Sequence, residues 1–190
     1  ASNTQILYAG TGESFPGGTY LKGNGIFKTT NKGDSWTQLL STTNNDYFAY
    51  VNRLIVDPAD EDIVIAATEK GIMKSVNGGA DWDTIYTITN GVEDLIANPK
   101  NFNTMYAAVN GAGVLKSVDA GNNWILSSDG LGNGKRYEIA ISAVDTNIIY
   151  ASENVSSTKS YVYRSIDAGA NWLKFEDKNL VKWRGIEEFS

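Results

Sequence analysis

The octapeptide "SVDAGNNW", residues 117–124, has three further counterparts in this chain of 190 residues. They are "TTNKGDSW" at 29–36, "SVNGGADW" at 75–82 and "SIDAGANW" at 165–172. Each copy starts with Ser or Thr, has Asp or Asn third and Gly fifth, and ends with Trp. Such fixed offsets indicate a structural repeat, and recognising the repeat decides which fold is predicted.

The segments around the octapeptide repeat in the same register. A short segment comes directly before each copy: "GIFK", "GIMK", "GVLK" or "YVYR". Longer apolar segments such as "DIVIAAT", "NTMYAAV" and "NRLIVDP" lie further upstream, and a short segment follows each Trp. Apolar or alternating runs bounded by turn residues predict strands. Each unit therefore has four strands, A to D in chain order, with the octapeptide between C and D.

The four terminal tryptophans of the octapeptides are 42 to 48 residues apart. A four-stranded unit of that length is the size of one β-propeller blade, and blades stack face to face to bury their apolar strands. We therefore predict an all-β fold, a β-propeller of about four four-stranded antiparallel blades. The blades are expected at about 4–40, 49–89, 91–128 and 135–176.

Each position of the octapeptide has a structural explanation. The fifth residue lies where a turn requires positive φ, which glycine adopts at little cost. The third residue can accept hydrogen bonds from backbone N–H groups of the turn. The Trp ring can insert between blades, where it buries a large area. The residues expected in these roles are Asn31, Gly33, Trp36, Asn77, Gly79, Trp82, Asp119, Gly121, Trp124, Asp167, Gly169 and Trp172.

This pattern resembles the Asp-box, or BNR, repeat, S/T-x-D/N-x-G-x-x-W, and the resemblance covers nearly the whole chain. Families with this repeat include sialidases, xyloglucan-degrading glycoside hydrolases, the luminal domain of sortilin, a photosystem assembly factor and many secreted bacterial proteins. In these families the box is structural and lies away from the active face. The resemblance therefore implies a propeller without implying one activity.

The two ends of the chain allow two arrangements. The chain opens on "QILYAGT", which matches strand B, so the first blade lacks its own strand A. "WRGIEEF" at 183–189 stands where a fifth strand A belongs. We favour part of a larger propeller, with further blades supplied by a longer chain or by another chain. In the alternative, 183–189 completes the first blade and closes a four-bladed ring without free edges.

The B–C and D–A loops of a propeller lie on the face opposite the octapeptides, so a ligand site is predicted there. The loops 10–25 and 41–50 are long and rich in aromatic and acidic residues. Such residues suit sugar rings or peptides; alternatively, they only hold the loops to the rim. The predicted ligand-binding residues are Glu13, Phe15, Tyr20, Asp46, Tyr47 and Tyr50.

The A strands are expected to line the central channel. Alignment of these strands places Arg53, Asp94 and Glu138 in equivalent positions. Side chains there can bind a ligand's charge, but we favour pairing with each other or with channel water.

Composition excludes several kinds of chemistry. The chain has no Cys and no His, which rules out thiolate catalysis, Cys/His zinc sites and Ser-His-Asp triads. Lys and Arg are scattered and the net charge is -6, so no nucleic-acid footprint is visible. No apolar stretch is long enough to span a membrane. We expect neither a metal nor a cofactor.

These observations favour a non-catalytic binding or scaffold propeller that recognises glycan or protein through its B–C and D–A loops. We expect it to be extracellular or periplasmic in a bacterium. The alternative is a glycoside hydrolase, which needs two carboxylates across a groove. Glu13 with Asp46 is the best pair that the sequence offers. The absence of the arginine-containing element that usually precedes the first box in sialidases favours a xyloglucanase-like activity over a sialidase.

Overall fold

The computed structural model of the chain describes residues 3–12, 14 and 20–175. The described residues form four antiparallel sheets, and their only helical segments are two short 3₁₀ turns. The predicted all-β fold is thus confirmed. Strands follow chain order within every sheet, as expected for consecutive blades.

The sheets are numbered as blades from the N-terminus. Blade 1 has three strands: β1 (Leu7–Gly10), β2 (Ile26–Thr29) and β3 (Thr37–Gln38). The turns η1 (Leu40–Thr42) and η2 (Asp46–Phe48) follow it. Blade 2 comprises β4 (Val51–Val56), β5 (Val64–Thr68), β6 (Gly71–Ser75) and β7 (Asp83–Thr87). Blade 3 comprises β8 (Val92–Asn98), β9 (Asn101–Val109), β10 (Gly113–Ser117) and β11 (Ile125–Leu126). Blade 4 comprises β12 (Arg136–Ile141), β13 (Ile149–Ser156), β14 (Lys159–Ser165) and β15 (Leu173–Lys174).

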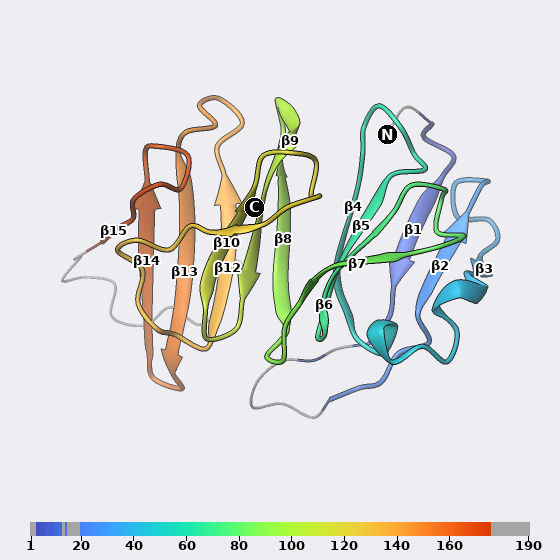
Figure 1. The fold of residues 1–190 in the computed structure, drawn as a ribbon, viewed down its shortest axis with the longest axis horizontal. Coiled ribbons are helices and arrows are strands. Elements are labelled where there is room, and N and C mark those ends of the chain that lie inside the picture. The colour runs from blue at the N-terminus through green and yellow to red at the C-terminus, as the bar shows by residue number, and fades with distance from the viewer. Residues whose placement is uncertain (1–2, 13, 15–19, 176–190) are drawn as a thin grey trace.

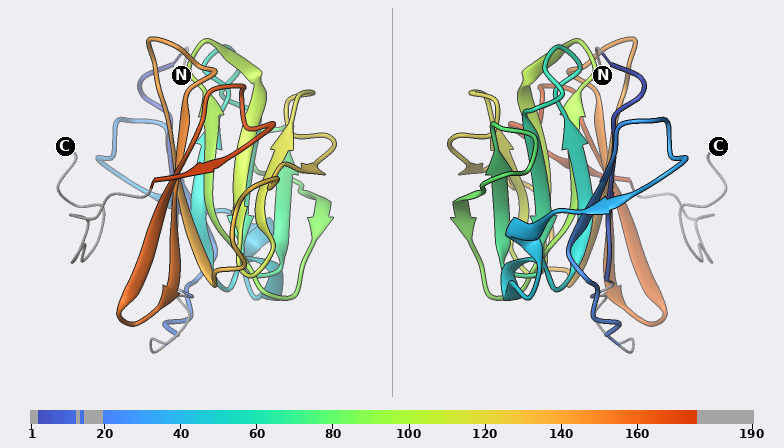
Figure 2. Two further views of the ribbon diagram at one scale, coloured as in Figure 1. Left: turned by 90° about the vertical axis from the view of Figure 1, so that its left-hand side faces the viewer. Right: turned by 90° about the vertical axis from the view of Figure 1, so that its right-hand side faces the viewer.

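The four blades stand side by side, with blade 1 and blade 4 at opposite ends of the row (Figures 1 and 2). The inner strand β8 contacts both β4 and β12, so the inner strands of blades 2 to 4 are neighbours. Among the described residues, no strand pairing or hydrogen bond joins blade 1 to blade 4. The described part of the chain is therefore an open row of blades.

Apolar side chains fill the space between successive blades. Between blades 2 and 3, for example, Ile65 and Ile72 pack against Met105 and Leu115, and all four are buried. Similar clusters lie between blades 1 and 2 and between blades 3 and 4. Burial of apolar surface at these three interfaces is the main force that holds the row together.

The four octapeptides form the same turn. In the third copy, Ser117 Oγ accepts from the Gly121 N–H (2.9 Å) and donates to Asp119 Oδ1 (2.8 Å). Asp119 Oδ1 also accepts from the Asn123 N–H (2.9 Å). Gly121 has a φ of 79°, the left-handed conformation that the sequence predicted for the fifth position. The equivalent bonds recur in the other three copies.

The four octapeptide tryptophans differ in burial. Trp172 is 3% exposed and donates its ring N–H to the Ser127 carbonyl of blade 3. Trp82 packs against Phe48, with ring centroids 5.1 Å apart. Trp36 is 42% exposed, so its ring does not insert between blades as expected. Each turn packs against the preceding blade, and no described blade precedes blade 1.

Some expectations concern a membrane span and residues outside the described ranges. No helix among the described residues is long and apolar enough to cross a bilayer. The predicted inner strand at 183–189 lies outside the described residues, as do Glu13 and Phe15. The choice between a closed ring and part of a larger propeller therefore stays a prediction.

Candidate functional site

The two long loops beside blade 1 lie against each other. The Gly23 N–H donates to the Ala49 carbonyl (2.8 Å), and the Val51 N–H donates to the Thr11 carbonyl (3.1 Å). Backbone hydrogen bonds of this kind fix the path of both loops. The structure therefore brings together loops that are far apart in sequence, at the end of the blades where inner strand β4 begins.

Side chains from both loops meet on this surface. The rings of Tyr20 and Tyr50 make an edge-to-face contact, with centroids 5.8 Å apart. Lys22 Nζ lies 3.8 Å from Asp46 Oδ1, and both side chains are well exposed. Tyr20 is 50% exposed. An accessible aromatic ring beside charged groups is an arrangement that can bind a ligand.

The remaining predicted residues of loop 41–50 have different surroundings. Asn45 accepts the Tyr47 N–H (3.1 Å) and so caps the short turn η2. The Tyr47 ring lies 5.8 Å from the ammonium group of Lys70, a cation–π contact to blade 2. Phe48, which belongs to the same aromatic run, is buried between blades 1 and 2. The proposed catalytic pair of Glu13 and Asp46 has only its second member among the described residues.

The three equivalent inner-strand residues form one cluster. Arg53 Nε lies 3.0 Å from Asp94 Oδ1, and Arg53 Nη2 lies 3.4 Å from Glu138 Oε2. Arg136 Nη2 approaches Glu138 Oε1 at 2.5 Å. Asp94 Oδ2 accepts the Ile139 N–H (2.8 Å). Both carboxylates are thus paired with arginine. The guanidinium groups are more exposed than the carboxylates, so they form the accessible side of the cluster.

Glu93 is a buried carboxyl group next to this cluster. The register of β8 against β9 shifts between Val92 and Asp94, so Glu93 occupies a β-bulge. It is 2% exposed, and both of its carboxyl oxygens are buried. Burial raises the pKa of Glu93 to about 7; the positive charge of Arg136 opposes this shift and the negative charge of Glu138 adds to it. Glu93 was not recognised from the sequence.

A second buried carboxylate, also not recognised from the sequence, lies in blade 4. Glu153 accepts from the hydroxyl groups of Tyr137 (3.0 Å) and Tyr163 (2.5 Å) and from the Gly134 N–H (2.6 Å). Burial raises the pKa of Tyr137 to about 12. A Cβ on Gly134 would come within 2.3 Å of Glu153 Cγ. The glycine-rich "GLGNGK" segment therefore encloses a carboxylate of the chain itself, which its glycines permit.

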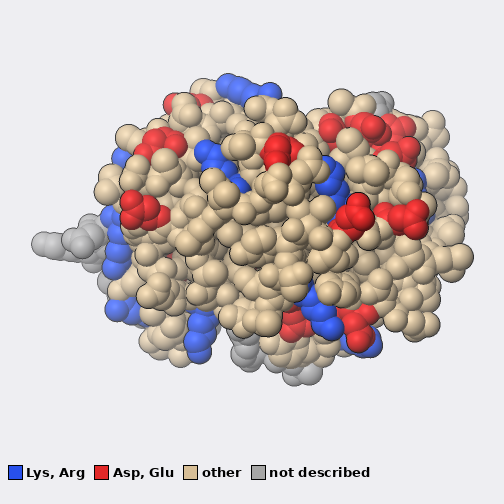
Figure 3. Space-filling view, in the orientation of Figure 1, with Lys and Arg blue, Asp and Glu red and all other residues tan. Residues whose placement is uncertain are grey.

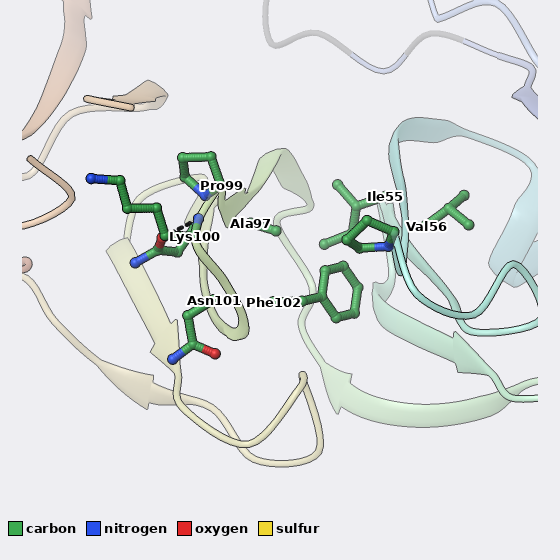
Figure 4. A pocket seen from close by; sticks show the side chains of 9 residues that line it. Ile55, Val56, Ala97, Pro99, Lys100, Asn101 and Phe102 are labelled. Carbon is green, nitrogen blue, oxygen red and sulfur yellow. Dashed lines mark hydrogen bonds between the residues drawn. The ribbon is translucent and has the colours of Figure 1, made fainter. Parts of the chain in front are cut away.

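A cleft lies at the opposite end of the inner strands (Figure 4). It has a volume of about 490 Å³ and lies between β4 and the β8–β9 turn, with Ile55, Ala97 and Phe102 among its lining residues. Lys100 is its single charged lining residue, and it donates to the Val144 carbonyl (2.7 Å). This cleft offers no carboxylate pair for hydrolysis.

Charged side chains are spread over the described residues. No group of three or more acidic side chains among them is arranged to hold a metal ion. Lys and Arg are dispersed over the face drawn in Figure 3 instead of forming one patch. A single basic patch or stripe is what phosphate backbones require.

Sequence comparisons identify no relative, whereas structure comparisons identify several. No protein-family model matches the chain. No curated protein sequence matches it either. An ancestral GH74 enzyme superposes with a TM-score of 0.71 at 21% identity, over 94% of this chain and 24% of the enzyme. The GH74 enzyme of Niastella koreensis gives 0.50 at 22% identity, over 91% of this chain and 36% of that one.

A third similar structure is YCF48 bound to a D1 peptide. It gives a TM-score of 0.55 at 16% identity, over 83% of this chain and 49% of YCF48. The chain therefore spans between a quarter and a half of the length of these proteins. At such identities the likeness shows the fold alone, and it supports a run of about four β-propeller blades.

Proposed function

We propose that this chain is a secreted bacterial binding or scaffold propeller of the Asp-box class, and that its loop face recognises a ligand without catalysis. The observation that carries the proposal is the surface formed by loops 10–25 and 41–50, where exposed Tyr20 contacts Tyr50. The exposed Lys22–Asp46 pair lies on the same surface. Aromatic faces stack on sugar rings, and flanking charged groups can bind their hydroxyl groups.

The carboxylates also favour binding over hydrolysis. Glycoside hydrolysis needs two carboxyl groups that face one substrate across a groove. In the described structure Asp94 and Glu138 are paired with arginine, and Glu93 is closed off from solvent. These groups are therefore better suited to hold the inner strands than to attack a glycosidic bond.

Binding can be tested on a glycan array and a peptide library with the wild-type chain. We expect Tyr20→Ala to weaken binding at least tenfold while the unfolding midpoint stays unchanged, because the ring is exposed. Val144→Ala, which trims an exposed apolar side chain of blade 4 far from these loops, is the control and should bind like wild type. Equal binding by wild type and Tyr20→Ala would contradict the proposed site.

The second candidate is a polysaccharide hydrolase. It is favoured by the fold shared with GH74 enzymes and by Glu93, whose pKa of about 7 suits a general acid, adjacent to Asp94. Release of reducing sugar from a polysaccharide such as xyloglucan, abolished by Glu93→Gln, would place this candidate first. Binding without release would support the non-catalytic function.

A further inference from the structure

The interfaces between blades repeat one polar contact. In blades 1 to 3, the residue before the octapeptide is a lysine that donates to the carbonyl of the fourth octapeptide residue in the next blade. Lys28 Nζ lies 3.3 Å from the Gly78 oxygen, and Lys74 Nζ lies 2.9 Å from the Ala120 oxygen. Lys116 Nζ lies 2.7 Å from the oxygen of the corresponding alanine of blade 4. We call this the cross-blade contact.

One donor and one acceptor of this series are left over. Arg164 occupies the lysine position in blade 4, and Lys32 carries the fourth-residue carbonyl in blade 1. Within residues 3–12, 14 and 20–175, the Arg164 guanidinium contacts the Phe175 ring but makes no hydrogen bond, and the Lys32 carbonyl accepts none. Blade 4 thus ends the row with an unused donor, and blade 1 begins the row with an unused acceptor of the cross-blade contact.

The apolar side chains of blade 1 that lie near the Lys32 carbonyl are also exposed to solvent. Leu7 in β1 is 44% exposed, whereas the residues at the same position of the other blades, Val64, Met105 and Ile149, are fully buried. Trp36 is likewise exposed, whereas its counterpart Trp172 is buried. We call this surface of blade 1, formed by Leu7, Lys32 and Trp36, the entry face.

On blade 4, aromatic side chains surround the donor Arg164. Tyr150 stacks on Phe175, with centroids 6.3 Å apart and planes inclined by 19°. The Arg164 guanidinium lies 5.5 Å from the same Phe175 ring. Both rings are exposed, whereas Tyr106, which occupies the position of Tyr150 in blade 3, is fully buried against blade 4. We call this surface, formed by Tyr150, Arg164 and Phe175, the exit face.

We propose that two copies of this chain associate head to tail, with the exit face of one copy packed on the entry face of the next. We choose a second copy as the partner because the two faces are complementary. The entry face supplies a carbonyl acceptor, a tryptophan ring and an apolar strand, and the exit face supplies a guanidinium donor and two aromatic rings. The two faces differ, so the contact is heterologous and gives a closed ring or an open series of copies. Arg164 then donates to the Lys32 carbonyl of the second copy, and Leu7 and Trp36 become buried.

The first test is the mass of the wild-type chain as a function of concentration, measured by sedimentation equilibrium. We expect the mass to rise from the 20.6 kDa of one chain to at least twice that value. Trp36→Ala and Arg164→Ala should each shift the transition to at least tenfold higher concentration. Val144→Ser, which changes an exposed apolar residue outside both faces, is the control and should leave the transition unchanged. A mass of one chain at all concentrations would overturn the proposal.

Chemical crosslinking then identifies the faces, because the chain has no cysteine of its own. A mixture of two single variants, Arg164→Cys and Lys32→Cys, should give a crosslinked dimer with a short bismaleimide. The internal pair Lys116→Cys with Ala168→Cys, at the equivalent contact, should crosslink within one chain and serves as the positive control.

The crosslinks also distinguish other occupants of the two faces. If Arg164→Cys and Lys32→Cys react only when both lie in one chain, the row closes on itself and the proposal is wrong. If the internal pair reacts and the mixture does not, the two faces do not meet and the proposal is also wrong.

Discussion

The two ends of the blades differ in whether their side chains repeat from blade to blade. At the octapeptide end, four turns use one pattern of hydrogen bonds, and their acidic residues lie at the surface. There, hydrogen bonds from the side chain and backbone of Asn123 and from Ser117 lower the pKa of Asp119 to about 2. At the loop end, each blade has different residues, and burial raises the pKa of Glu93 to about 7.

This difference shows where the repeat is constrained. Each turn must satisfy its own backbone groups and pack against the preceding blade, so the same eight positions recur. The starts of the inner strands face no repeated partner, and Arg53, Asp94 and Glu138 occupy one equivalent position with three different side chains. A surface that varies from blade to blade is suited to bind a ligand that lacks the symmetry of the repeat.

The largest expected effect concerns the packing of the octapeptide tryptophans. Trp172→Ala should lower the free energy of unfolding by about 3–5 kcal/mol, because it leaves a cavity between blades 3 and 4. Trp36→Ala, in the same turn of blade 1, should cost less than about 1 kcal/mol in the isolated chain, because its ring is exposed. Urea unfolding of both variants measures the difference. Equal losses would mean that the tryptophan acts within its own turn and not between blades.

The second prediction concerns the pH dependence of stability that Glu93 produces at the loop end. The folded pKa of Glu93 lies above its unfolded value near 4.5, so the stability it contributes is complete below pH 4.5 and is lost as pH rises through 7. Glu93→Gln keeps the shape and removes the ionisation. At pH 8 the variant should therefore be more stable than wild type, by on the order of 2 kcal/mol.

The same pair of proteins supplies the control for Glu93. Well below pH 4.5 the advantage of Glu93→Gln should disappear, because the wild-type carboxyl group is then neutral in both folded and unfolded chains. Unfolding midpoints measured from about pH 3 to pH 8 give the comparison. A constant difference between the two proteins across this range would show that Glu93 does not titrate as described.

The sequence predicted one end of the blades far better than the other. The octapeptide turns could be predicted because their hydrogen bonds join residues two to four positions apart, so the pattern is visible in the sequence itself. Glu93 could not be predicted, because its burial depends on a bulge in β8 and on residues of β12 more than 40 positions away. Glu153 was missed for the same reason: Gly134 and Tyr163 reach it from a loop and from a neighbouring strand.

The third prediction concerns this missed network. Tyr163→Phe removes a hydroxyl group that donates to the buried Glu153, and it should lower the free energy of unfolding by about 1–3 kcal/mol. Tyr161→Phe is the matched control two residues away, because the Tyr161 ring is only partly buried and lies beside Lys159 and Lys174. It should change stability by less than about 0.5 kcal/mol. Similar losses for the two variants would show that Glu153 gains nothing from the Tyr163 hydroxyl group.

The smallest expected effect tests the octapeptide turn itself. Where the third residue is aspartate, the seventh is asparagine, and the amide of Asn123 donates to Asp119 Oδ2 (2.7 Å). In the second copy the two residues are exchanged, and the amide of Asn77 donates to Asp81 Oδ2 (3.1 Å). Asp119→Asn should therefore lower the unfolding midpoint slightly at pH 7, because two amides then face each other. The double variant Asp119→Asn with Asn123→Asp should restore it.

The pH dependence of this exchange follows from the lowered pKa. Because the folded pKa of Asp119 lies below its unfolded value of 3.8, the stability it contributes is present above pH 3.8 and is lost as pH falls towards 2. Wild type and Asp119→Asn should therefore differ at pH 7 and converge near pH 2. Thermal melts at the two pH values measure this. A double variant no more stable than Asp119→Asn would show that the third and seventh residues act independently, and that their exchange between copies does not preserve the bond.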